Sequence, residues 1–339
     1  MDKPYIPEYI AKIVKASGIK AHELVLIHFW GEDSDRQIAL EFVKAAAALG
    51  ASPVLLQQSR LANRDLFENA ADICFDDNYF SLFSRFDAVL DVFAYQPVVL
   101  GYELAAGKFE LYRRYMARLF SQLMKAGRFT QIRIPTKANA AEAGLSPAAY
   151  MERMDRAYDI DYDSLLASCI QLKERLEQQK QLVIITGNGC RLFFDLEGRG
   201  WHIDAGDGDW PCGEVCIAPN EARTNGSIFF DRLFIEEAGV FSQVTLQIQN
   251  GRVTGINHDS VRQYFESLAP GDRIVCELGF GMNPGVTDLC GYTVLDEKMA
   301  GSFHIAVGAN NMFGGQNASS LHVDLVNAGP FKWRPAGEM

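Results

Sequence analysis

The feature that most constrains the fold is a pattern of strand, helix and strand within residues 23–58. ELVLIHFW (23–30) is a short apolar run typical of a buried strand, and ASPVLLQQ (51–58) predicts a second strand. Between them, residues 31–50 combine turn residues, an amphipathic helical pattern and a terminal glycine. Two strands joined by a helix form a βαβ unit, which implies a parallel sheet covered by helices. No GxGxxG motif follows the first strand, so the pattern does not indicate dinucleotide binding.

The alternation of strands and helices continues to about residue 180 and then stops. Further strands are predicted at 86–94 and 130–135, and helices at 103–126, 146–160 and 166–180. After residue 180 the chain consists of short apolar stretches separated by turns, and QNGR (249–252) is a strong hairpin signal. We therefore expect an α/β N-terminal domain with a parallel sheet and flanking helices at 1–180, followed by a β-rich C-terminal domain at 181–339.

The length of 339 residues agrees with two domains, because single hydrophobic cores stop growing at about 250–300 residues. The formal charge of −11 argues against nucleic acid and anionic membranes as partners, since both require clustered Lys and Arg. No apolar run reaches the length of about 18 residues that a membrane span needs, and the first residues lack the apolar segment of a secretory signal. We expect a cytoplasmic protein whose seven cysteines, which form no CxxC pair, are reduced.

Residues that could carry chemistry concentrate at 211–324. Six potential metal ligands lie there, each in a segment that also contains Gly, Pro or Asn: Glu214, Glu277, Glu297, His304, His322 and Asp324. His322 and Asp324 form the strongest local signal, because residues two apart in a strand point to the same face and can bind one ion. A set of carboxylates and imidazoles without thiolates suits one or two divalent ions of the zinc, cobalt or manganese class in a hydrolytic site.

Single residues of this set leave other interpretations open. His304 lies in an apolar strand pattern, and by itself it is typical of a core histidine. Glu277 lies among apolar and glycine residues, where a glutamate requires a metal or a salt-bridge partner. Asp324 alone could be a turn or cap residue. The remaining histidines have no comparable neighbours and are interpreted as structural or surface residues: His22, His28, His202 and His258.

Other charged residues near the six candidates are assigned no place in a metal site. Lys298, directly after Glu297, is interpreted as a surface lysine, with an electrostatic role beside the ligands as the alternative. The segment HIDAGDGDW resembles a calcium-binding loop in composition but lacks the glutamate that ends such a loop. We therefore expect a solvated turn for its three aspartates, Asp204, Asp207 and Asp209.

Four motifs in the order of the chain resemble the aminopeptidase T family of metallopeptidases. They are PCGEVCIAPNEARTNGSIFFD, ELGFGMNPG, LDEKMAGSFHIAVG and GGQNASSLHVDLV. The resemblance implies a dimeric enzyme with an α/β N-terminal domain and a two-ion centre in a β-rich C-terminal domain. Carried over position by position, the ligands of the family match the six residues chosen above on chemical grounds.

The chain departs from the family at a position close to the centre. The family has a tyrosine, thought to assist the transition state, seven residues after the histidine that matches His304, and this chain has Asn311 there. An asparagine can donate a hydrogen bond to an oxyanion but cannot act as a phenolic acid. The stretch between His304 and His322 is also shorter than in the peptidases, and this stretch is expected to shape the substrate pocket.

A related branch of the same fold consists of ring-opening hydroxypyridine dioxygenases with one iron. Iron in that branch is held by two His and one Asp, which here correspond to His304, His322 and Asp324. The chain resembles this branch in its compact length and in its FGGQN segment (313–317). That branch has a histidine at the position of Glu277, however, so Glu277 favours a two-ion hydrolase.

The sequence therefore predicts an aminopeptidase-type hydrolase that cleaves an N-terminal peptide bond or a small amide. Two divalent ions of the zinc, cobalt or manganese class would activate a water, with Glu277 or Glu297 as general base and Asn311 near the oxyanion. The alternatives are an Fe(II) dioxygenase, an amidase for a small metabolite, and a relative without catalytic activity. A homodimer is expected from the resemblance alone.

Overall fold

A computed structural model describes residues 7–97 and 104–338 of the chain. Contacts within the chain divide it into two compact units. The first comprises the described residues up to 162 together with 206–211, and the second comprises 163–205 and the described residues from 212 onward. The helix predicted at 166–180 therefore falls with the second unit. The return of residues 206–211 to the first unit has no signal in the sequence.

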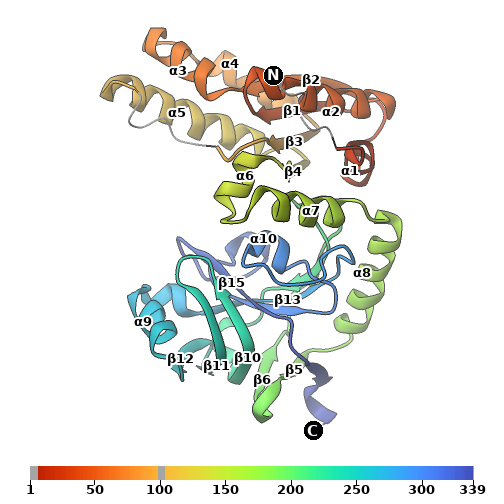
Figure 1. The fold of residues 1–339 in the computed structure, drawn as a ribbon, viewed down its shortest axis with the longest axis vertical. Helices are drawn as coiled ribbons and strands as arrows, with labels where there is room; N and C mark the ends of the chain where they lie inside the picture. Colours follow the sequence, from red (N-terminus) through yellow and green to blue (C-terminus); the bar gives the residue numbers. More distant parts are fainter. Residues whose placement is uncertain (1–6, 98–103, 339) are drawn as a thin grey trace. The chain divides into compact units, whose positions relative to one another are not determined.

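The first unit is built on the parallel sheet that the βαβ pattern predicts (Figure 1). In spatial order its strands are β2 (Ser52–Gln58), β1 (Leu24–Trp30), β3 (Ala88–Phe93), β4 (Arg128–Arg133) and β8 (Asp209–Trp210). Every neighbouring pair in this sheet is parallel. The predicted fold class of this half is confirmed, and β8 is supplied by the returning segment 206–211.

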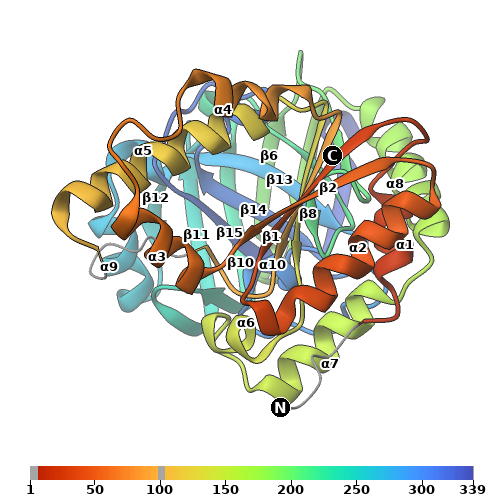
Figure 2. The ribbon, with the colours of Figure 1, turned by 90° about the horizontal axis from the view of Figure 1, so that it is seen from above.

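Helices cover both faces of this sheet, as Figure 2 shows. One face carries α1 (Ile10–Ala16) and α2 (Arg36–Ala48), and the opposite face carries α3 (Arg60–Asn69), α4 (Asp77–Ser81) and α5 (Ala106–Leu123). Four of the five buried side chains of α5 recur every four residues, and Tyr112 lies beside them, so they form one apolar stripe: Leu111, Tyr115, Leu119 and Leu123.

Two further helices, α6 (Lys137–Glu142) and α7 (Pro147–Tyr158), follow β4 along the chain. The start of α7 is fixed by its sequence, because the Ser146 hydroxyl accepts a hydrogen bond from the Ala149 amide and Pro147 occupies the first turn. Local capping chemistry therefore determines where this helix begins.

The second unit is β-rich, as predicted, and contains two antiparallel sheets. Sheet B has the order β12 (Arg252–Ile256), β11 (Gly239–Gln249), β10 (Asn225–Ile235), β6 (Arg191–Asp195), β5 (Gln181–Ile185) and β16 (Lys332–Pro335). Sheet C has the order β15 (His322–Asn327), β14 (Phe303–Gly308), β13 (Val275–Gly281), β9 (Glu214–Ile217) and β7 (His202–Asp204). The helices of this unit are α8 (Tyr162–Glu177), α9 (Asp259–Ser267) and α10 (Thr293–Asp296).

The QNGR segment forms the predicted hairpin between β11 and β12. Gln249 pairs with Arg252, and the two residues between them have φ angles of 49° at Asn250 and 74° at Gly251. Positive φ at both central positions is the geometry that Asn-Gly favours in a two-residue hairpin turn. A Cβ at residue 251 would also overlap the carbonyl oxygen of Glu221, so this position requires glycine.

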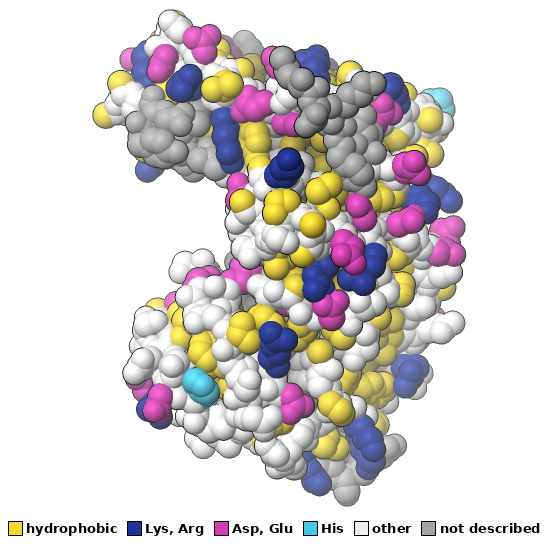
Figure 3. Space-filling view, viewed as in Figure 1, with side chains coloured by type: hydrophobic (Ala, Val, Ile, Leu, Met, Phe, Trp, Pro, Cys, Tyr) yellow, Lys and Arg dark blue, Asp and Glu magenta, His cyan; other side chains and the backbone are white. Residues whose placement is uncertain are grey.

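No helix among the described residues is long and apolar enough to cross a membrane. On the face drawn in Figure 3, acidic and basic side chains are interspersed and do not gather by sign. The interior of the second unit, in contrast, contains a concentration of charged side chains. Among the strands of sheet C, Glu277 and His304 are buried and further carboxylates are half-buried, and these residues form the candidate site.

Candidate metal centre

The pairing of sheet C places four of the six sequence-predicted ligands on one face. Ala306 of β14 pairs with Glu277 on one side and with Asp324 on the other, and residues directly opposite in a sheet share a face. His304 lies two residues before Ala306, and His322 lies two residues before Asp324, so both point to the same side. Strand alternation therefore gathers these ligands from three adjacent strands.

The same register continues across β13, β9 and β7. Gly281 pairs with Glu214, and Glu214 pairs in turn with Asp204. Since Gly281 is four residues after Glu277 in one strand, Glu214 and Asp204 also belong to this face. A fifth sequence-predicted ligand therefore joins the set, and Asp204, for which a solvated turn was expected, joins it as well.

Glycine makes room for the imidazole of His304. Gly279 lies directly opposite His304 in the sheet, and a Cβ at residue 279 would overlap the Nε2 atom of that ring. The glycine thus lets the ring lie across the strand toward the carboxylates. Glycine is needed at residue 279 because any side chain would collide with the ring. Its φ angle is one that other residues also adopt.

Potential donor atoms form two groups that share one carboxylate. The first group is Glu214, Glu277 and His304, and the second is Glu277, His322 and Asp324. Oε1 of Glu277 lies 3.4 Å from Nε2 of His304, whereas its Oε2 lies 3.3 Å from Nε2 of His322. The outer carboxylates are Glu214, whose Oε2 lies 3.6 Å from His304, and Asp324, whose Oδ1 lies 3.4 Å from His322.

The backbone selects the form of His322 that can bind a metal. Its Nδ1 lies 2.8 Å from the carbonyl oxygen of Ala309, which can only accept a hydrogen bond from that nitrogen. Nδ1 therefore carries hydrogen, and in the neutral ring Nε2 keeps its lone pair toward Glu277 and Asp324. The side chain of His322 is 31% exposed, whereas that of His304 is fully buried, so ligand or solvent can reach the second group from the side of His322.

The charges of the site shift the pKa values of the groups that share it. Burial opposes ionisation of Glu277, but the imidazoles of His304 and His322 outweigh it and hold the pKa of this carboxyl below its usual value. Burial lowers the pKa of His304, but Glu277, Asp324 and Glu214 together raise it to about 9. The metal-free site therefore holds protons on its imidazoles, which a metal ion must displace.

Glu297 and Lys298 follow α10 directly, and their positions correct the expectation of a surface lysine. Lys298 is 2% exposed, and its Nζ lies 2.9 Å from Oε1 of Glu297. Glu297 belongs to neither ligand group. Burial, together with the charges of Asp324 and Glu214, raises the pKa of Glu297 above its usual value, although Lys298 acts in the opposite direction.

The places of Lys298 and Asp204 in the site were not predicted from the sequence. The ammonium lies 3.4 Å from Oδ2 of Asp204 and 2.6 Å from Oε1 of Glu214. A signal for Asp204 was available, because HID (202–204) has the same spacing as HVD (322–324). No comparable signal marks Lys298, since lysine and glutamate are both mostly exposed residues.

Asn311 lies on the loop after β14 and begins a short 3₁₀ helix, Asn311–Phe313. It is exposed, and among the described residues its side chain makes no hydrogen bond to the six candidate ligands. The preceding residue is instead the buried one. Asn310 donates to Oε1 of Glu221 and to the carbonyl oxygen of Cys276, and it accepts from the amide of Asn317, so it fixes the loop that leads to His322.

The donor set fits a divalent metal ion. Oε2 of Glu214 is buried and has no hydrogen-bond partner among the described residues, although it faces the imidazole of His304. A buried carboxylate oxygen without a donor is costly unless a cation is nearby. Carboxylates and neutral imidazoles without thiolates are the ligands of zinc, cobalt and manganese in catalytic sites.

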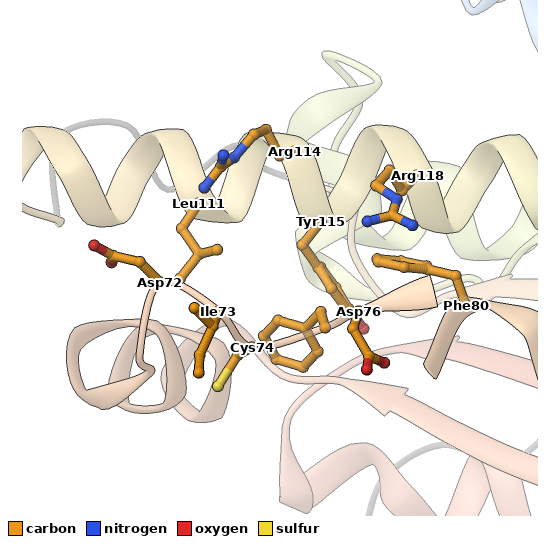
Figure 4. Close-up of a pocket in the computed structure, with 10 residues that line it drawn as sticks. Asp72, Ile73, Cys74, Asp76, Phe80, Leu111, Arg114, Tyr115 and Arg118 are labelled. Atoms are coloured by element: carbon orange, nitrogen blue, oxygen red, sulfur yellow. The ribbon is translucent and has the colours of Figure 1, made fainter. Parts of the chain in front are cut away.

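A cavity of about 220 Å³ lies in the first unit and is separate from these ligands, because none of its lining residues belongs to the site. Figure 4 shows it between α5, which supplies Leu111, Arg114, Tyr115 and Arg118, and the segment that contains residues 72–80. The guanidinium of Arg118 lies 4.2 Å above the ring of Phe80 and pairs with Asp77.

Comparisons with known proteins agree with a metal-dependent enzyme. Residues 8–331 match the family model of the thermophilic metalloproteases (M29). Among solved structures, the chain is similar to 2,5-dihydroxypyridine dioxygenase from Pseudomonas putida KT2440, with 16% identity and a TM-score of 0.64 over 97% of this chain and 92% of that one. It is also similar to wild-type AmpT from Thermus thermophilus, with 18% identity and a TM-score of 0.62 over 96% and 94%. No curated protein matches the sequence.

The chain belongs to the thermophilic metalloprotease family, because the family model covers nearly all of it. The resemblance to the aminopeptidase T family is thereby confirmed, and so is the prediction that the protein is a hydrolase of the metallopeptidase class. The two solved structures, each under 20% identical, show the fold.

Proposed function

We propose that the protein is an aminopeptidase that hydrolyses N-terminal peptide bonds or small amides with two divalent ions of the zinc, cobalt or manganese class. The observation that supports it is the position of Glu277. Its two carboxylate oxygens face different imidazoles, one in each ligand group. A carboxylate shared in this way suits a bridge between two neighbouring ions.

The remaining residues take separate roles in this proposal. Glu214 and His304 complete one ligand group, and His322 and Asp324 complete the other. Ions bound there would polarise the scissile carbonyl and lower the pKa of a bound water toward about 7. The surplus of carboxylates also suits the ammonium group of a free peptide N-terminus.

Glu297 is the better placed of the two carboxylates considered as general base. It lies outside both ligand groups, so neither of its oxygens has to serve as a ligand there, and Oε1 pairs with Lys298. Glu277 has a lowered pKa and directs both oxygens at imidazoles, which suits a ligand. Asn311 is assigned to the oxyanion on its sequence position after His304, and association of two chains belongs to the same proposal.

The test begins with the metal content of protein purified without added metal. About two zinc-, cobalt- or manganese-class ions per chain are expected, together with hydrolysis of aminoacyl amides. Glu277→Ala should remove the ions and lower the hydrolysis rate by more than about 100-fold. Even residues that only hydrogen-bond to a metal ligand typically change metal affinity or activity by 10–100-fold. Glu266→Ala, an exposed glutamate on α9, is the matched control, and Asn311→Ala should lower turnover with the metal content unchanged.

An iron-dependent ring-opening dioxygenase is the second candidate, because a dioxygenase is among the solved structures with this fold. His304, His322 and Asp324 would supply a set of two histidines and one carboxylate for one Fe(II). One iron per chain that survives Glu277→Ala, with oxygen consumption on 2,5-dihydroxypyridine, would establish this candidate and exclude the hydrolase. Absence of any bound metal would reject both.

A further inference from the structure

Lys298 is a charged side chain enclosed by three carboxylates from separate parts of the chain. Its Nζ lies 2.6 Å from Oε1 of Glu214, 2.9 Å from Oε1 of Glu297 and 3.4 Å from Oδ2 of Asp204. These carboxylates come from β9, from the residue after α10 and from β7. The side chain of Lys298 is 2% exposed, and those of its partners are between 13% and 16% exposed.

An ammonium donates three hydrogen bonds, and here the three nearby acceptors are all carboxylates, which carry more negative charge than one ammonium balances. Several carboxylates around one positive centre are also the donor arrangement of a cation site built from oxygen ligands. The backbone fixes the lysine in this position, because its amide donates to the carbonyl oxygen of Leu295 and its carbonyl oxygen accepts from the amide of Asn283. The ammonium of Lys298 therefore lies where a bound cation could lie, and it is part of the protein chain.

Glu214 connects this position with the proposed metal centre. Oε1 of Glu214 lies against the ammonium, whereas its Oε2 faces Nε2 of His304 in the first ligand group. One carboxylate thus has one oxygen committed to Lys298 and the other directed at the metal ligands. If the ammonium were absent, Glu214 would be free to turn and bind an ion through both oxygens.

We propose that Lys298 is a positioning residue that serves as a permanent third cation beside the two ligand groups. It holds Glu214 so that one oxygen faces His304, and it excludes divalent ions from the carboxylates of Asp204, Glu214 and Glu297. It also holds Glu297 through Oε1 of that carboxylate. The inference rests on the proposed metal centre, but it concerns the number of ions that the centre admits.

The experiment counts the ions bound by metal-free protein when Mn²⁺ is added, by calorimetric titration and by metal analysis after gel filtration. Lys298→Met keeps the length of the side chain and removes the charge, so Asp204, Glu214 and Glu297 are expected to bind one more Mn²⁺ than the wild type does. Lys298→Arg keeps the charge and is expected to bind the wild-type number. Lys180→Met is the matched control, because Lys180 is an exposed lysine paired with a glutamate in the same unit.

The outcomes separate this inference from the proposed function. Wild-type protein that binds no Mn²⁺ would reject the metal centre. An equal number of ions in the wild type and in Lys298→Met, with affinities within about twofold, would reject only the role of Lys298. Loss of a residue that positions a metal ligand typically changes metal affinity by 10–100-fold. If the wild type binds one ion and Lys298→Met binds two, the role of Lys298 stands and the two-ion count is wrong.

Loss of folding in Lys298→Met is also informative, because the proposal states that a divalent ion can replace the ammonium. Lys298→Met and the neutral, polar variant Lys298→Gln are refolded with and without Mn²⁺ and followed by circular dichroism. Recovery of the folded state by Mn²⁺, with no such requirement in Lys298→Arg, supports the proposal. Failure of Mn²⁺ to recover either neutral variant overturns it.

Discussion

His28 and His304 occupy comparable places in the two units and differ in what surrounds them. Each side chain has no exposed surface, and each lies in an interior strand of its sheet, β1 in the parallel sheet and β14 in sheet C. Each also has a carboxylate partner, since Nδ1 of His28 lies 2.8 Å from Asp91 and Nε2 of His304 lies 3.4 Å from Glu277. Burial and an acidic neighbour therefore do not by themselves distinguish a metal ligand from a core histidine.

The carboxylates make the distinction. Asp91 also accepts hydrogen bonds from the indole of Trp30 at 2.9 Å and from Gln131 at 3.4 Å, so the donors around it satisfy its charge. Glu277 is shared between two imidazoles and also accepts from the Cys216 thiol, while the second carboxylate facing His304, that of Glu214, has an oxygen with no hydrogen-bond partner among the described residues. A surplus of carboxylate oxygens over donors marks the place where a cation binds.

The strongest test of this comparison applies one substitution at both histidines. His304→Ala removes a ligand of the first group and should lower the affinity for divalent ions at that group by more than about 100-fold. Residues that only hydrogen-bond to a ligand already contribute 10–100-fold to metal affinity. Isothermal titration of the metal-free protein measures this affinity. Two ions bound as tightly as in the wild type would show that His304 is a core histidine like His28.

A smaller effect is expected from pH. The pKa of His304 in the metal-free protein is raised to about 9, so the ring carries a proton at neutral pH. A metal ion binds the neutral ring, so protons compete with the ion below pH 9, and the apparent affinity should rise about tenfold per pH unit for each proton displaced. Titrations in two buffers of different ionisation enthalpy report the proton release, and an affinity independent of pH between 6 and 9 would contradict the expectation.

Fold class could be predicted from the sequence because its signals are local. The βαβ pattern predicted the ends of β1 and β2 to within one residue and placed α2 between them, and QNGR predicted the hairpin at Gln249 and Arg252. The segment 206–211 was not predictable, because its strand β8 is two residues long and pairs with residues of β4 that lie 78 positions earlier in the chain.

The residues of the site were partly predictable for the same reason. The ligands that lie in strands, such as His322 and Asp324, follow from alternation along one element. Lys298 could not be found in this way, because its burial depends on carboxylates 84 and 94 residues earlier in the chain, on β9 and β7. A charged residue is assigned to the surface unless the partners that compensate its burial are known.

The smallest effect on metal binding is expected at His28. His28→Ala breaks a fully buried pair and leaves Asp91 without one of its donors, so the free energy of unfolding should fall by about 3 kcal/mol. Metal affinity should not change, because neither residue belongs to a ligand group. Urea unfolding of the metal-free protein measures the first quantity and the same titration measures the second. Loss of metal binding in folded His28→Ala would mean that the two buried histidines are linked, and the difference drawn from their carboxylates would then not explain their roles.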